Sequence, residues 1–153
     1  MKILFLDIDG VVNSENTFFR TKGERDSLFV IDPYMALLVA RIVEATGVQI
    51  VLSSSWRHHP DGIAVVEKRV WKILDKTPTM PRPTGTGVEY GERGREIKEW
   101  LSRHPEVEQY AILDDDSDML PEQLPNFFKT SWKTGITDEI SKKIIEHFNG
   151  KSL

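Results

Sequence analysis

The sequence predicts a three-layer α/β fold of Rossmann-like type, in which helices cover both faces of a mostly parallel sheet. Short apolar runs, of a length that suits strands better than helices, alternate with segments whose apolar residues recur at helical spacing. This alternation is typical of units in which a helix connects two parallel strands. The 153 residues are enough for one core, so we expect a single domain over residues 1–153.

Three apolar runs are predicted as the central strands of this sheet. They cover residues 2–7, 48–52 and 109–113 and are rich in β-branched, aliphatic or aromatic residues. Residues 126–132 are a candidate for a last strand.

Helices are predicted between these strands. The first begins at Asp32, a good N-cap residue, with Pro33 at the first helical position, and it ends at Gly47. Apolar spacing predicts further helices over residues 61–76 and over about 93–103. A closing helix is marked by three apolar residues: Ile140, Ile144 and Phe148.

Two segments do not fit this pattern. Residues 14–30 are polar with scattered aromatic residues and are expected to leave the sheet, as a possible short flap. Residues 77–92 are rich in proline and glycine, which predicts a loop. Neither segment is large enough to form a domain with its own core.

The composition excludes several classes of protein. Twenty basic and 24 acidic side chains give a net charge of −4, which argues against a surface that coats nucleic acid but allows a local basic cleft. The lack of cysteine excludes disulfides, thiolate zinc sites and cysteine nucleophiles. The first apolar run is short and contains Asp7 and Asp9, unlike a signal peptide, and no segment is long enough to span a membrane. We therefore expect a soluble, cytoplasmic protein.

Polar residues follow each of the central strands. Asp7 and Asp9 leave the first strand, and Gly10 then permits a sharp turn. The serines at 53–55 follow the second strand, and an acidic cluster at 114–118 follows the third. Because parallel strands end at the same edge of a sheet, where ligands bind in open α/β folds, we expect these residues to meet there.

So many carboxylates at one edge would repel one another and raise their pKa values. A hard cation relieves this repulsion, and a donor set of oxygens without histidine or cysteine suits Mg²⁺. Since Mg²⁺ commonly binds one or two carboxylates together with phosphate oxygens, a phosphorylated substrate is expected.

Each feature also has a simpler explanation. Asp-x-Asp-Gly alone also suits a turn or part of a calcium loop, although the strand before it argues against such a loop. The acidic cluster at 114–118 is also compatible with a solvated turn, and the serines at 53–55 with a helix cap. Residues 57–59 (Arg-His-His) are expected in a polar loop, and the tryptophans are expected to be packing residues.

The segment from Phe5 to Asn13, FLDIDGVVN, resembles the first motif of phosphatases of the haloacid dehalogenase (HAD) superfamily. The serine run resembles the second motif, Arg93 or a neighbour the third, and Ile-Leu-Asp114-Asp115 the fourth. The resemblance extends from Ile3 to about residue 137. It is greatest to small, nearly capless members, some of which are associated with RNA-repair systems.

This resemblance implies a role for each matched residue. Asp7 would be the nucleophile that forms an aspartyl-phosphate, and Asp9 the general acid and base. Ser54 and Arg93 would bind the phosphoryl group, with Ser53 and Ser55, and Arg95 and Lys98, as alternatives. The residues that would hold Mg²⁺ are Asp7, Asp9 through its backbone carbonyl, Asp114 and Asp115.

The superfamily usually selects substrates with a cap domain, which neither insert here is large enough to form. An open site admits the end of a polynucleotide or a protein loop. We therefore expect a Mg²⁺-dependent phosphomonoesterase that acts on a nucleotide, a nucleic-acid end or another large phosphorylated substrate. The alternatives are a small-metabolite phosphatase and a signalling phosphoacceptor or phosphate-binding module without turnover.

Overall fold

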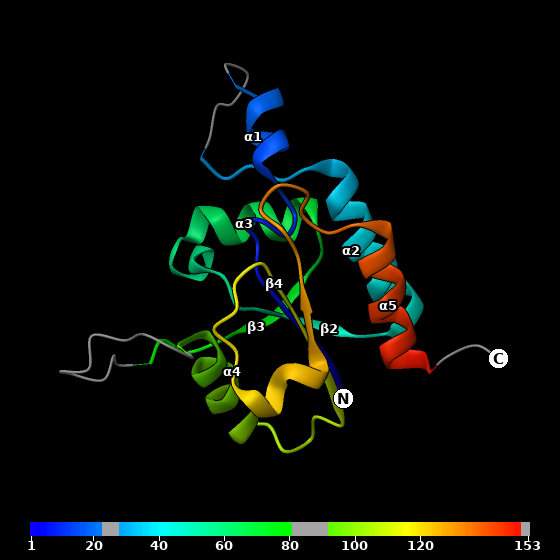
Figure 1. The fold of residues 1–153 in the computed structure, drawn as a ribbon. Coiled ribbons are helices and arrows are strands. Elements are labelled where there is room, and N and C mark those ends of the chain that lie inside the picture. The colour runs from blue at the N-terminus through cyan, green and yellow to red at the C-terminus, as the bar shows by residue number, and fades with distance from the viewer. Residues whose placement is uncertain (23–27, 81–91, 151–153) are drawn as a thin grey trace.

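The computed structural model describes residues 1–22, 28–80 and 92–150. Its centre is a five-stranded sheet in the order β3-β2-β1-β4-β5, in which all neighbouring strands are parallel (Figure 1). The strands are β1 (Lys2–Leu6), β2 (Gln49–Leu52), β3 (Ile73–Lys76), β4 (Gln109–Asp114) and β5 (Phe127–Lys129). The predicted α/β fold with a parallel sheet is confirmed.

The strand order places the functional edge of the sheet around β1. The chain runs from β1 outward through β2 to β3, and then returns to the other side of β1 with β4. Hydrogen bonding continues past the strand ends, since the Asp7 N–H donates to the Leu113 carbonyl (3.0 Å) and the Ser53 N–H to the Leu6 carbonyl (2.9 Å). Ser53, Asp7 and Asp114 therefore lie side by side at the carboxyl edge, as the sequence predicted.

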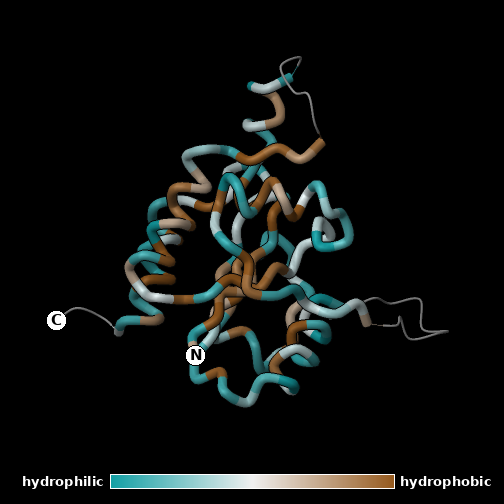
Figure 2. The backbone as a smooth tube through the Cα atoms, turned by 180° about the vertical axis from the view of Figure 1, so that it is seen from behind, coloured by the Kyte–Doolittle hydropathy of each residue, from teal (hydrophilic) through white to brown (hydrophobic). Residues whose placement is uncertain are grey.

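Helices cover both faces of the sheet. They are α2 (Pro33–Thr46), α3 (Pro60–Arg69), α4 (Glu92–Ser102) and α5 (Asp138–Asn149). Leu4 and Leu6 of β1 belong to a larger core with residues of α2, α3 and α5. Ile3 and Phe5, on the opposite face of the strand, belong to a smaller core with residues of α4. Figure 2 shows the apolar strands at the centre and hydrophilic residues along the outer helices.

The predicted ends of α2 are confirmed. The Asp32 carboxylate accepts a hydrogen bond from the Tyr34 N–H (3.0 Å), and Pro33 occupies the first turn. Gly47 ends the helix in the left-handed region, with φ of 74°. The closing helix α5 contains all three of the apolar residues that predicted it.

The expected excursion at 14–30 contains a short helix that the sequence did not indicate. This helix, α1 (Glu15–Arg20), begins with a capping box between Ser14 and Thr17. The Thr17 hydroxyl also donates to the Asp32 carboxylate (2.9 Å), which ties α1 to the start of α2. In Figure 1, α1 projects from the body of the molecule. Residues 23–27 of the expected flap lie outside the described part of the chain.

The predicted helix over 61–76 is wrong in its second half. Helix α3 ends at Arg69, and Ile73–Lys76 form β3, which pairs with β2 at the edge of the sheet. Ile73 continues the helical spacing of Val66 and Val70, so periodicity alone did not separate the two elements. Residues 73–76 form a strand rather than a helix because they pair with β2.

The remaining elements are short. Two 3₁₀ helices, η1 (Ser55–His58) and η2 (Pro121–Asn126), follow β2 and precede β5. The predicted last strand is limited to β5, and of the predicted loop at 77–92 residues 81–91 lie outside the described ranges. Within the described ranges, no helix has the length and apolar character needed to cross a membrane.

Candidate active site

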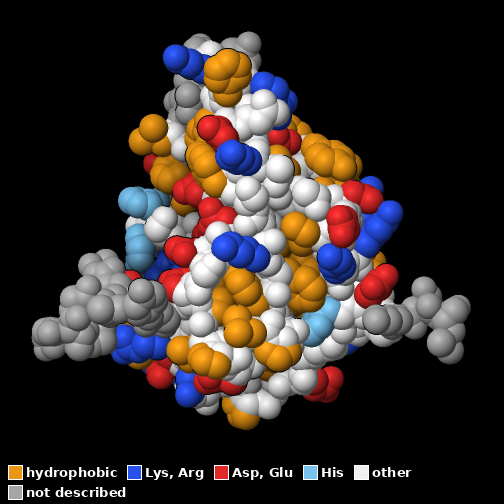
Figure 3. Space-filling view, in the orientation of Figure 1, with side chains coloured by type: hydrophobic (Ala, Val, Ile, Leu, Met, Phe, Trp, Pro, Cys, Tyr) orange, Lys and Arg blue, Asp and Glu red, His pale blue; other side chains and the backbone are white. Residues whose placement is uncertain are grey.

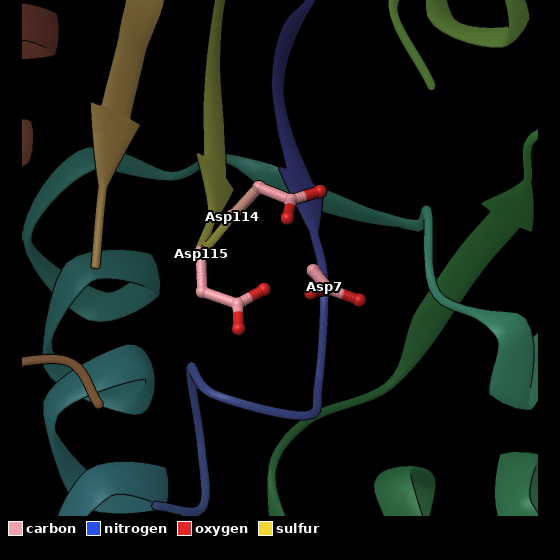
Figure 4. A group of neighbouring side chains, drawn as sticks. All are labelled: Asp7, Asp114 and Asp115. Atoms are coloured by element: carbon pink, nitrogen blue, oxygen red, sulfur yellow. The ribbon is translucent and has the colours of Figure 1, made fainter. Parts of the chain in front are cut away.

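Three carboxylates meet at the carboxyl edge, where the chain switches sides of β1. Asp7 follows β1, Asp114 ends β4, and Asp115 comes next. One oxygen from each lies within 4.8 Å of the others, and Figure 4 shows the three side chains around a common space. Asp7 and Asp114 are only 7% and 2% exposed. The sequence predicted this meeting point, because parallel strands end at the same edge of a sheet, where ligands bind in such folds.

Gly10 allows the chain to turn closely around these acids. Its φ is +80°, and a Cβ at this position would lie 2.1 Å from the Asp115 Oδ2. The Gly10 carbonyl accepts a hydrogen bond from the Thr130 hydroxyl (2.6 Å), which fixes the turn against the strand end after β5. Any side chain at residue 10 would displace the Asp115 carboxylate.

Arg93 brings a positive charge to the cluster from the first turn of α4. Its Nη1 lies 3.5 Å from Asp7 Oδ1 and 3.8 Å from Asp114 Oδ2. The Asp118 carboxylate accepts a hydrogen bond from the Arg93 backbone N–H (3.1 Å) and so anchors the start of the helix. Of the alternative cations, exposed Lys98 pairs with a surface glutamate, and among the described ion pairs none joins Arg95 to this cluster. The geometry favours Arg93.

Burial and mutual repulsion shift the pKa values of these acids. Burial, and then the charge of Asp114, raise the pKa of Asp7 well above its usual range, although Arg93 opposes this. Burial raises the pKa of Asp114 to about 6. Burial lowers the pKa of Arg93, but the carboxylates of Asp7 and Asp114 outweigh it and the net shift is upward. The pKa values of Asp7 and Asp114 thus rise in the predicted direction, with burial rather than repulsion as the first cause.

Asp9 stands apart from the three clustered carboxylates. Its Oδ1 accepts a hydrogen bond from Asn13 Nδ2 (3.0 Å), and its Oδ2 accepts one from Trp56 Nε1 (3.1 Å). Among the described residues, its carboxylate is not one of those that meet at the common space. Asp9 therefore differs from Asp7 in its surroundings, an arrangement that allows two carboxylates to take different chemical roles.

The serines after β2 differ in what their hydroxyls contact. Ser54 Oγ accepts a hydrogen bond from the Trp56 N–H (3.1 Å) and caps η1, which is the simpler role considered for this run. Ser53 Oγ instead lies 3.4 Å from Arg93 Nη1, within hydrogen-bonding distance, in line with Asp7 on the sheet edge. Ser55 is exposed. For a phosphate ligand, the geometry favours Ser53 over Ser54.

A comparison with known protein families supports the resemblance seen in the motifs. The model of the HAD domain in Swiss Army Knife RNA repair proteins matches residues 3–140. The chain belongs to this family. No curated protein and no solved structure matches it. Membership in the HAD superfamily indicates a hydrolase of phosphatase type.

The acidic cluster of this HAD domain is suited to a divalent cation. Asp114 Oδ2 is buried and has no hydrogen-bond partner among the described residues, and Arg93 Nη1 is too distant at 3.8 Å to supply one. A buried carboxylate oxygen without a hydrogen-bond donor costs folding free energy unless a cation binds it instead. The oxygen-only donors of Asp7, Asp114 and Asp115 fit a hard metal ion.

The HAD domain contains a buried ion pair that the sequence did not reveal. Arg57, expected in a polar loop, is 6% exposed and donates to the Glu96 carboxylate of α4 and to the carbonyls of Ser54 and Thr77. Glu96 Oε1 also lies 4.0 Å from Arg93 Nε. In the sequence, the spacing of three residues places Glu96 on the same helix face as Arg93, but nothing indicates its pairing with Arg57. The pair connects η1 to α4 next to the site.

Proposed function

We propose that this HAD domain is a Mg²⁺-dependent phosphomonoester hydrolase that works through an aspartyl-phosphate on Asp7. The observation that carries the proposal is the placement of Asp7 beside Arg93 and next to the Asp114 and Asp115 carboxylates. A nucleophile beside a cation and a candidate metal site suits phosphoryl transfer, which depends mainly on positioning and electrostatics.

In the first step, an Asp7 carboxylate oxygen attacks phosphorus and forms a P–O bond. The bond from phosphorus to the leaving oxygen breaks, and that oxygen receives the proton of Asp9. The products are an alcohol and the aspartyl-phosphate. The Arg93 guanidinium and the Ser53 hydroxyl bind the phosphoryl oxygens during the transfer.

In the second step, water attacks the phosphorus of the aspartyl-phosphate and gives a proton to Asp9. The bond between phosphorus and the Asp7 oxygen breaks, which releases inorganic phosphate and restores both carboxyl groups. Asp7, Asp114 and Asp115 would hold Mg²⁺, with the Asp9 carbonyl as the further ligand that the motif implies. When bound, the ion supplies positive charge beside the transferring group.

The substrate we propose is a large phosphorylated molecule, such as the terminal phosphate of a nucleic acid. Between β1 and β2 the described structure adds α1 to the usual connecting helix, which is a small insert for a cap. The family takes its name from RNA repair proteins, which supports such a substrate. On the face seen in Figure 3, basic side chains are interspersed with acidic ones, which suits recognition of an end better than coating of a strand.

The test is hydrolysis of para-nitrophenyl phosphate and of a panel of phosphorylated ends and metabolites. We expect activity with Mg²⁺, none with a chelator, and none in Asp7→Asn. Asp61→Asn, the same change at an exposed position in α3, should leave the rate unchanged. Activity that persists in Asp7→Asn would contradict the nucleophile, and a long-lived phosphorylated wild type would indicate a phosphoacceptor instead. Preference for a small sugar phosphate would contradict the open site.

A further inference from the structure

The carboxylate of Asp9 is held by two donors that come from different parts of the chain. Asn13 lies in the turn after β1, and Trp56 lies in η1 after β2. Each donates to a different oxygen of Asp9, at 3.0 and 3.1 Å. Two bonds to two oxygens fix both the position and the plane of a carboxyl group. Each oxygen still has a lone pair after accepting one bond, so either can carry the proton.

The orientation of the Asn13 amide is fully determined. Its Oδ1 accepts from the Gly10 N–H (2.9 Å), so its Nδ2 must face the other way. That Nδ2 donates both to Asp9 and to the Val30 carbonyl (2.9 Å). Asn13 is completely buried, and a rotated amide would leave these groups unpaired. The Asn13 donor is therefore built to face Asp9.

The Trp56 indole is held with similar precision. It is 4% exposed, and its backbone N–H is bound by the Ser54 hydroxyl. The Phe29 ring packs edge-on against it, with the ring centroids 5.0 Å apart. Phe29 also lies against Gly62 of α3, where a Cβ would come within 2.9 Å of the ring. In the position held by this packing, Nε1 points at the Asp9 carboxylate.

One short segment thus contacts both donors. Phe29 and Val30 lie where the chain returns to the core from the excursion at 14–30, and they touch Trp56 and Asn13 respectively. We propose that Asn13 and Trp56 are positioning residues that aim the Asp9 carboxyl group at the leaving-group oxygen, and that Phe29 and Val30 hold them in place. The inference rests on the proposed phosphatase function and deepens it.

This role makes a specific kinetic prediction. An alkoxide leaving group needs a proton as its bond to phosphorus breaks, whereas para-nitrophenolate leaves without one. The value of kcat/KM reports on steps up to release of the alcohol, so it isolates this proton transfer from the later attack of water. Misplacing Asp9 should therefore slow the hydrolysis of a substrate with a poor leaving group far more than that of a substrate with a good leaving group.

The experiment compares benzyl phosphate with para-nitrophenyl phosphate, two substrates of similar size and different leaving group. In Trp56→Phe, which keeps a buried ring and removes the donor, we expect kcat/KM to fall roughly 10- to 100-fold for benzyl phosphate and less than about threefold for para-nitrophenyl phosphate. Trp100→Phe is the matched control, because Trp100 is equally buried but donates to Asp75. It should leave the ratio of the two values unchanged.

A second variant and a double variant separate positioning from general damage. Phe29→Leu should show the same selective loss to a smaller degree, even if Trp56→Phe does not fold. In an Asp9→Asn background, Trp56→Phe should cause no additional loss for benzyl phosphate, because it acts through Asp9.

Equal losses on both substrates, or an additional loss in the Asp9→Asn background, would overturn the inference. If the wild type hydrolyses both substrates and Asp7→Asn neither, the proposed function stands whatever the outcome of this comparison. If the wild type hydrolyses neither substrate, the proposed function itself fails.

Discussion

The buried carboxylate of Asp114 should make the cation-free protein less stable at neutral pH than at acid pH. Its pKa is raised from an ordinary value of 3.8 to about 6, with burial as the first cause. At about 1.4 kcal/mol for each pH unit, this difference corresponds to about 3 kcal/mol of folding free energy. Asp7, whose pKa is raised in the same direction, adds to the effect.

The sign follows from proton linkage. The folded state binds the Asp114 proton more tightly than the unfolded state, because burial disfavours the charged form. The stability that this proton contributes is fully present below about pH 4 and is lost as the pH rises to about 6. Above that pH the fold contains an unfavourable buried charge unless a cation neutralises it.

The variant Asp114→Asn tests this reasoning, because its amide has nearly the shape of the carboxyl group and cannot ionise. In chelator at pH 7.5, we expect it to be more stable than the wild type by up to about 3 kcal/mol in urea denaturation. Saturating Mg²⁺, at about 100 times its Kd, should raise the free energy of unfolding of the wild type by about 2.7 kcal/mol. It should leave that of the variant nearly unchanged. Asp116→Asn, an exposed neighbour in the same loop, is the matched control.

Two results would refute the reasoning. One is an Asp114→Asn variant that is less stable than the wild type in chelator, which would mean that the carboxylate stabilises the fold without a cation. The other is equal stabilisation of both proteins by Mg²⁺, which would place the ion elsewhere.

Three further predictions concern the surroundings of the cluster. Gly10→Ala should abolish hydrolysis and weaken Mg²⁺ binding in calorimetry. Gly47→Ala is its control, because Gly47 has a similar positive φ but open space around it; this change should lower the free energy of unfolding by only about 1 kcal/mol and leave kcat/KM unchanged. Ser53→Ala should lower kcat/KM in steady-state assays, whereas Ser54→Ala should mainly lower stability by about 1 kcal/mol through loss of a cap; the reverse pattern would restore Ser54 as the phosphate ligand. Glu96→Gln should lower the free energy of unfolding in urea by about 3–5 kcal/mol, because a buried guanidinium loses its counter-charge, and a change below about 1 kcal/mol would contradict a structural ion pair.

The meeting of Asp7 with Asp114 could be predicted from the sequence because it needs only the direction of the strands. Once apolar runs indicate a parallel sheet, residues just after the strands must share one edge. The sequence pattern did not separate Ser53 from Ser54. Adjacent side chains point in different directions, and which serine faces the site depends on the residue at which β2 ends. The structure shows that Ser54 caps η1 and that Ser53 faces Arg93, which favours Ser53 as the ligand to be tested.

Contacts between docked elements could not be predicted in the same way. Arg57 and Glu96 are far apart in sequence, and they meet only because α4 packs beside η1. Of the tryptophans expected to pack, Trp56 and Trp100 are buried, whereas Trp132 is 43% exposed. Burial of Trp56 alone does not say which group its N–H meets. The boundary between α3 and β3 was not predicted for the same reason. The apolar spacing of residues 70–76 also suits a helix, and only pairing with β2 makes residues 73–76 a strand.

The charges around the site show why a divalent ion in particular fits it. Arg57 pairs with Glu96, which faces Arg93, and Arg93 in turn faces Asp7 and Asp114. With Asp115, the described ion pairs and the acidic cluster join four carboxylates to two guanidinium groups, while Asp118 faces the N-terminus of α4 and is favoured there. The excess is two negative charges, concentrated where the Asp114 oxygen lacks a donor. A monovalent ion would balance half of this excess. Protonation would remove the anionic form of Asp7 that the proposed mechanism needs, whereas a divalent ion would balance the charges and keep Asp7 ionised.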